Sequence, residues 1–193
     1  MKKKDKPKLN LVIDTTHSRS WKGIVWHHSV SPDTPGRDWP GIVRYHTSYR
    51  VDFEIVTKLE FYRRLANHEG KVFQKPWRDV GYNGGTEWVE NKVIFNWGRP
   101  LDEVGAHSGV QGVSNRFNEW YLGFCAVGDF DKAPPKPEHW DFNLQLTRAF
   151  MEAFQIPASQ VIGHREVFDR LGVARQKSCP GHSWDMNLFR GNL

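Results

Sequence analysis

The sequence predicts a single α/β domain of two or three layers, built on one mixed β-sheet. Its 193 residues are enough for one well-buried domain and few for two. Short apolar, β-rich runs are interspersed with helical segments, without the regular strand–helix–strand repeat of a parallel sheet. The chain has no internal repeat and no linker to a second folded module. These observations together favour one mixed sheet with helices packed against it.

The elements of the first half follow from apolar periodicity. Residues 9–13 are expected to form a short strand, and residues 23–27 a stronger one that ends in histidine. A Pro- and Gly-containing loop follows at 31–36. Residues 39–50 fit a helix, and residues 59–67 fit another, because leucine and tyrosine recur there at helical spacing among charged side chains.

The second half begins with a strand region at 79–83. A hairpin that turns at Asn91 is expected next, with strands at 87–90 and 92–97. A long polar loop is predicted over 98–119. Four more elements complete the order: a strand at 121–127, the strongest helix at 138–154, a short strand at 161–163 and a short closing helix within 183–193.

Composition indicates a globular protein and disfavours a nucleic-acid partner. Hydrophobic residues make up 38% of the chain and charged residues 25%, which excludes a disordered chain. The net charge is +5, but residues 1–8 hold five lysines and one aspartate and are expected to form a flexible basic tail. The domain at 9–193 is then nearly neutral. No run fits a signal peptide or a transmembrane helix, so the protein is expected to be made in the cytoplasm.

Two histidines and a cysteine point to a metal site. His27 ends one predicted strand, and His164 follows another. Cys179 lies in a polar loop beside Lys177, a setting expected to lower the pKa of the thiol and favour the thiolate. Two imidazoles and one thiolate suit Zn²⁺, and three protein ligands leave the fourth tetrahedral position open, as in catalytic zinc sites.

Two other histidines remain alternatives at this site. His28 could replace its neighbour His27, and His182 stands in a Cys-x-x-His spacing with Cys179 that could close the site. Cys125 lies in an apolar strand and is expected in the core. Four histidines without a motif are expected at the surface: His17, His46, His68 and His139.

Six sequence blocks, in order, carry a family resemblance. They are VWHHS at 25–29, DVGYN at 79–83, GRP and GAHS within 98–108, LGFCAVGDF at 122–130, GHREV at 163–167 and KSCPG at 177–181. With them the chain resembles the zinc-dependent N-acetylmuramoyl-L-alanine amidases of the amidase-2 type. These include amidase-type phage lysozymes and share a fold with peptidoglycan recognition proteins. The resemblance implies a central mixed sheet flanked by helices, with a zinc cleft on one face.

The resemblance also implies the site and the reaction. By position, the zinc ligands are His27, His164 and Cys179. Tyr82 and Lys177 match residues that assist catalysis in the phage lysozyme branch, and His107 matches a histidine on the cleft wall near the substrate. The implied reaction is hydrolysis of the amide bond between N-acetylmuramic acid and L-alanine in peptidoglycan, with Tyr82 and Lys177 stabilising the oxyanion.

Three departures from the family pattern are informative. Cys125 stands where many bacterial members have a catalytic glutamate, which places this chain with the tyrosine–lysine branch. Residues 51–75 are expected to be an insertion that could reshape the groove, and Tyr121 replaces a small polar residue. Four tryptophans are candidate groove walls: Trp26, Trp39, Trp88 and Trp97.

The predicted role is that of a monomeric phage or prophage endolysin. It would bind peptidoglycan and no nucleic acid, and it would reach the cell wall with the help of a separate permeabilising protein. A bacterial wall-recycling amidase is the close alternative. A non-catalytic peptidoglycan-binding protein on the same fold is the other, and the intact set of His27, His164 and Cys179 argues against it.

Overall fold

A computed structural model describes residues 9, 11–31 and 37–193. The expected basic tail at 1–8 and most of the loop at 31–36 lie outside these residues. The predicted mixed sheet is confirmed: five strands lie in the order β6–β5–β7–β1–β8. Strands β5, β7, β1 and β8 are mutually parallel, and β6 pairs antiparallel to β5. The five strands are β1 (Gly23–His28), β5 (Gly84–Val89), β6 (Lys92–Trp97), β7 (Tyr121–Ala126) and β8 (Val161–Gly163).

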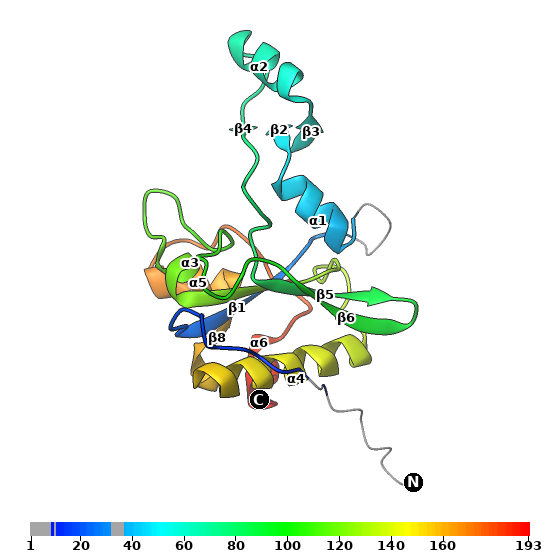
Figure 1. Cartoon of the computed structure of the whole chain (residues 1–193), viewed down its shortest axis with the longest axis vertical. Helices are drawn as coiled ribbons and strands as arrows, with labels where there is room; N and C mark the ends of the chain where they lie inside the picture. The colour runs from blue at the N-terminus through cyan, green and yellow to red at the C-terminus, as the bar shows by residue number, and fades with distance from the viewer. Residues whose placement is uncertain (1–8, 10, 32–36) are drawn as a thin grey trace.

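Helices cover both faces of this sheet (Figure 1). One face carries α4 (Pro137–Phe154) and α6 (Met186–Gly191), and the other carries α1 (Trp39–His46), α3 (Arg116–Trp120) and α5 (His164–Leu171). A single 3₁₀ turn at Ala158–Gln160 leads into β8. None of the helices in the described part of the chain combines the length and apolarity needed to cross a bilayer.

The alternation of side chains along β1 decides which histidine reaches which face. Ile24 and Trp26 belong to the larger core cluster, which contains the apolar side of α4. Val25 belongs to the cluster on the opposite face, beside α5. Because successive side chains of a strand point to opposite faces, His27 emerges on the side of α1 and α5 and His28 on the side of α4.

A second, small sheet stands apart from the main one. Its strands β2 (Tyr49–Val51), β3 (Glu54–Val56) and β4 (Phe73–Gln74) lie in the order β3–β2–β4 and are antiparallel. Helix α2 (Lys58–Ala66) packs on this sheet through the ring of Phe61, which contacts the rings of Tyr49 on β2 and Phe73 on β4. Figure 1 shows the unit extending away from the main sheet beyond α1. It overlaps residues 51–75, which the sequence sets apart as an insertion, but β2 begins two residues earlier, at Tyr49.

Several element predictions are wrong in informative ways. Residues 9 and 11–13 form no strand; Leu9, Leu11 and Ile13 instead pack against the core, and Leu9 N donates to Gln145 Oε1 at 2.8 Å. The helix expected at 39–50 ends at His46, and the chain enters β2 at Tyr49. The loop expected over 98–119 contains the start of α3, and the strand expected at 79–83 begins only at Gly84.

His139 was expected at the surface and is instead buried, with 4% of its surface exposed. It belongs to a polar network between β5 and α4. The Thr86 hydroxyl donates to Asn143 Oδ1 at 2.8 Å, so it accepts from Nε2 of His139 at 2.9 Å. Burial lowers the pKa of His139 to about 4, which keeps the ring neutral at physiological pH.

This buried imidazole should make the fold sensitive to acid. Unfolded histidine has a pKa of about 6.5, so below that pH the unfolded state binds more protons than the native state. The free energy of unfolding should therefore fall as pH decreases from about 6.5 towards 4. His139→Gln keeps a hydrogen-bond donor for Thr86 but does not titrate. Between pH 7 and pH 5, its free energy of unfolding should fall by about 2 kcal/mol less than that of the wild type. Urea unfolding at both pH values measures this, and an equal loss in the two proteins would contradict it.

Candidate metal centre and active-site cleft

Three side chains from distant parts of the sequence meet at one end of the sheet. His27 lies near the end of β1, and His164 begins α5 directly after β8. Strands β1 and β8 are parallel neighbours with Trp26 beside Gly163, so the next residue of each chain segment is a histidine. Cys179 reaches the same point from the loop between α5 and α6. The candidate ligand atoms of the three lie within 4.8 Å of one another, and all three side chains are buried.

The geometry of this cluster fits tetrahedral zinc. Cys179 Sγ lies 3.6 Å from His27 Nδ1. Zn–S and Zn–N bonds of about 2.3 and 2.05 Å at a tetrahedral angle place sulfur and nitrogen about 3.6 Å apart. Among the described residues, the structure brings His27, His164 and Cys179 together in this way. Three protein ligands would leave one tetrahedral position open, as in catalytic zinc sites, and all three residues line the cleft described below.

His107 fixes the ring of His27 for metal binding. Nε2 of His107 faces the carbonyl of Tyr121 at 3.2 Å, to which it donates. Its Nδ1 therefore accepts, from the Ser108 hydroxyl at 2.6 Å and from Nε2 of His27 at 3.0 Å. His27 thus carries its proton on Nε2, which leaves the lone pair of Nδ1 directed at Cys179. An outer hydrogen bond of this kind orients a ligand and raises its basicity.

The two alternative ligands point elsewhere. His28 Nδ1 accepts from the backbone N–H of Phe130 at 3.2 Å, and its ring stacks on Phe130 on the far side of the sheet. The side chain of His182 is 78% exposed and lies 3.9 Å from Asp131. The structure therefore leaves both outside the three-residue cluster.

Burial sets the protonation of the site when no metal is bound. It lowers the pKa of His164 and of His107 to about 3 and that of His27 well below its usual range, so the imidazoles are neutral, as a metal requires. Burial also raises the pKa of the Cys179 thiol to about 12. The hydrogen bond from the His28 N–H and the charge of Lys177 both lower this pKa, but by less than burial raises it. The expectation that Lys177 lowers this pKa below its ordinary value is wrong; deprotonation of the thiol depends on the metal itself.

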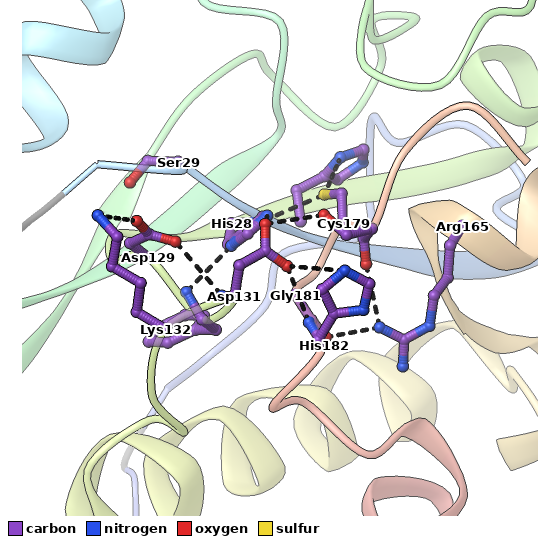
Figure 2. Close-up of polar contacts among 12 residues, drawn as sticks. His28, Ser29, Asp129, Asp131, Lys132, Arg165, Cys179, Gly181 and His182 are labelled. Atoms are coloured by element: carbon purple, nitrogen blue, oxygen red, sulfur yellow. Dashed lines mark hydrogen bonds and ion pairs between the residues drawn. The ribbon is translucent and has the colours of Figure 1, made fainter.

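The loop that carries Cys179 is held from two sides (Figure 2). Asp131 accepts from the Ser178 hydroxyl at 2.8 Å and from the backbone N–H of His182 at 2.9 Å. Arg165 donates from its backbone N–H to the Cys179 carbonyl at 2.7 Å, and its side chain donates to carbonyls of Ser178 and Gly181 at 3.0 and 2.6 Å. The loop is therefore preorganised to present Cys179.

His28, Asp129 and Asp131 form a second group whose ligand atoms lie close together (Figure 2). Because Nδ1 of His28 accepts a hydrogen bond, the neutral ring carries its proton on Nε2 and has no lone pair to offer there. Asp129 is paired with Lys132 at 2.9 Å. This group therefore supports the loop and does not suit a metal.

Removing the carboxylate of Asp131 should weaken metal binding without touching a ligand. We expect Asp131→Ala to lower zinc affinity about 10- to 100-fold, because it frees Ser178 and His182 on either side of Cys179. Competition with a chromogenic chelator measures the affinity. Lys132→Ala is the control, since Lys132 is exposed and its ion pair is with Asp129. Equal affinities in wild type and Asp131→Ala would show that the loop is held by Arg165 alone.

The cluster opens into a cleft of about 1470 Å³, which the predicted catalytic residues also line. The ring of Tyr82 packs against His27 with centroids 5.1 Å apart, and burial raises the pKa of Tyr82, so the hydroxyl stays protonated. Lys177 is exposed at the edge of the cleft. His107 lines it too, although its ring nitrogens are engaged; its contact with substrate stays a prediction, as do the roles of Tyr82 and Lys177.

The aromatic walls of the cleft differ from those expected. Trp26 and Trp39 are buried in the core, and Trp88 and Trp97 lie on the β5–β6 hairpin, away from the cleft. The lining instead includes four other aromatic residues: Tyr45, Phe53, Trp77 and Phe168.

His46 also lines the cleft and is not the surface residue that was expected. Its Nδ1 accepts from the backbone N–H of Gly81 at 3.0 Å, next to Tyr82. Burial lowers the pKa of His46 to about 4, with a smaller contribution from Arg50. No motif marks His46 or Trp77, so the sequence alone gave no signal for them.

Comparisons with known proteins agree with this geometry. The profile of the Amidase_2 family, described as N-acetylmuramoyl-L-alanine amidase, matches residues 17–182. A search of curated proteins gives no match.

Solved structures share the fold. The amidase LysC from Clostridium intestinale has 19% identity and a TM-score of 0.56, covering 89% of this chain and 84% of its own. The Ph2119 endolysin from a Thermus scotoductus bacteriophage has 18% identity and a TM-score of 0.52, covering 91% and 86%. The E. coli amidase AmiD has 14% identity and a TM-score of 0.54, covering 94% and 60%. Since the family profile spans most of the chain, the protein belongs to the Amidase_2 family of N-acetylmuramoyl-L-alanine amidases.

Proposed function

We propose that this protein hydrolyses the amide bond between N-acetylmuramic acid and L-alanine in peptidoglycan, with zinc held by His27, His164 and Cys179. The observation that carries the proposal is the buried cluster of these three residues at the floor of a large cleft. Membership of the amidase family supports the reaction. AmiD, which shares the fold, has been solved with anhydro-N-acetylmuramic acid-L-Ala-D-γ-Glu-L-Lys, a fragment of the proposed type of substrate.

The residues around the cluster suit amide hydrolysis. Zinc, when bound, supplies an activated water and polarises the carbonyl of the substrate. Tyr82, which stays protonated, donates a hydrogen bond to the oxygen where negative charge develops. Lys177 places its ammonium group at the edge of the same cleft and stabilises that charge. His107 keeps the His27 ring in one tautomer and orientation throughout.

The bond cleaved is identified by its products. Purified, zinc-loaded protein is incubated with isolated cell walls, and new amino termini and new reducing sugar ends are both measured. We expect free N-terminal alanine to appear, with no increase in reducing ends. New reducing ends would indicate a glycosidase, and uncut muropeptides with zinc bound would contradict the proposal.

We further propose an endolysin role, in which the protein acts on the wall after a separate protein permeabilises the membrane. The shared fold with the Ph2119 endolysin is consistent with this role. Expression in a susceptible bacterium should leave the culture intact until the membrane is permeabilised, after which lysis should be rapid. A recycling amidase would instead act on soluble muropeptides in preference to intact walls.

A further inference from the structure

The tip of the β2–β3 hairpin is strained. Val51 pairs with Glu54, so Asp52 and Phe53 form a two-residue loop, and both have positive φ, 48° and 72°. Loops of this type favour Asn-Gly or Asp-Gly, because side chains with a Cβ are crowded in the left-handed region. A phenylalanine at the second position works against local stability. Strain at a bulky residue makes that residue a candidate for a function, which its surroundings must then support.

The loop is also held rigidly. The carboxylate of Asp52 accepts from the backbone N–H groups of Lys71 and Val72 at 2.9 and 2.8 Å, and its own N–H donates to the Val72 carbonyl at 2.9 Å. The base of the unit is fixed by Arg50, which is buried with its guanidinium 4.2 Å from the ring of Tyr45 and 5.6 Å from that of Trp77. The backbone at Phe53 is therefore held by the hydrogen bonds of Asp52 at the tip of the hairpin and by the packing of Arg50 at its base.

Phe53 packs little against the rest of the protein, since 71% of its surface is exposed. It nevertheless lines the cleft that contains His27, His164 and Cys179. Gln74 of β4 lines the cleft as well, and it pairs with Arg50 of β2. Helix α2 covers the opposite face of the small sheet through Tyr49 and Phe73. The uncovered side of the unit thus forms an outer wall of the cleft, with the aromatic ring of Phe53 at its tip.

We propose that Phe53 is a substrate-binding residue, whose ring packs on a C–H-bearing face of peptidoglycan away from the scissile amide. A sugar ring and the aliphatic part of a stem peptide both offer such a face. The inference rests on the proposed function and deepens it, because it assigns the small sheet to the recognition of polymeric substrate. Because the contacts of Asp52 hold the backbone of this loop in place, binding needs to order little more than the side chain of Phe53 itself.

The test is a substitution that relieves the strain and removes the ring together. Phe53→Gly should leave the melting temperature unchanged or higher, yet lower kcat/KM on isolated cell walls at least about threefold. Asn91→Gly is the matched control: Glu90 and Asn91 form the corresponding loop of the β5–β6 hairpin, with φ of 47° and 62°, outside the cleft. It should retain the wild-type kcat/KM. A change below about threefold in Phe53→Gly, or an equal change in Asn91→Gly, would overturn the proposal.

A binding assay separates this inference from the proposed function. Metal-free protein is sedimented with insoluble cell walls, so binding is measured without hydrolysis. Phe53→Gly should bind at least about threefold more weakly than wild type, whether or not the wild type cleaves the wall. Undiminished binding would overturn the inference. Competition with glycan strands and with stem peptides identifies which of the two faces Phe53 contacts.

Discussion

Replacement of Cys179 by serine should abolish stoichiometric zinc binding and reduce amidase activity to the level of the metal-free protein. Serine does not supply a thiolate, and the buried hydroxyl would leave zinc with two imidazoles. Zinc content is measured by elemental analysis, and activity by release of N-terminal alanine.

The control for this variant is the other cysteine. Cys125→Ala removes a buried thiol that packs with Trp39 and Val80 and is not part of either group of candidate ligands in the described part of the chain. It should keep one zinc per chain. Full zinc content and activity in Cys179→Ser would mean that the cluster is not the catalytic metal site.

Tyr82→Phe should lower kcat by about two to three orders of magnitude while leaving zinc content unchanged. The substitution keeps the ring that packs on His27 and removes only the hydroxyl, which is protonated because burial raises the pKa of Tyr82. The loss would therefore reflect one hydrogen bond to the developing negative charge. Lys177→Met tests the second stabilising group in the same way, and steady-state kinetics on a soluble muropeptide measure both.

Tyr45→Phe is the matched control, since this tyrosine lines the cleft beside Arg50. It should change kcat less than about threefold, because its hydroxyl is assigned no contact with the developing charge. A Tyr82→Phe variant with near-wild-type kcat would assign Tyr82 to packing alone.

Strong periodicity made much of the main sheet predictable. The strands around 23–27, 121–127 and 161–163, the hairpin at 87–97 and the helix at 138–154 all appear as expected. Strand alternation also explains why His27 and not His28 enters the cluster. The small sheet was not predictable, because strands of two or three residues are too short to carry a period.

The burial of individual polar residues also could not be predicted from the sequence. His46 and His139 lack a motif, and their partners Gly81 and Thr86 lie far away in sequence. The location of the tryptophans was equally unpredictable. Composition shows that they are numerous, but only the packing of the fold places Trp26 in the core and Trp77 in the wall of the cleft. The pKa of Cys179 follows burial, which the sequence of its loop does not reveal.

The central claim, an open three-ligand zinc site, is tested most directly by zinc K-edge X-ray absorption of the purified protein. The expected first coordination sphere has one sulfur at about 2.3 Å, two imidazole nitrogens at about 2.0–2.1 Å and one further oxygen at about 2.0–2.2 Å. The imidazole and sulfur contributions would come from His27, His164 and Cys179. A sphere without sulfur, or with a third imidazole in place of the oxygen, would contradict the open site and with it the proposed catalysis.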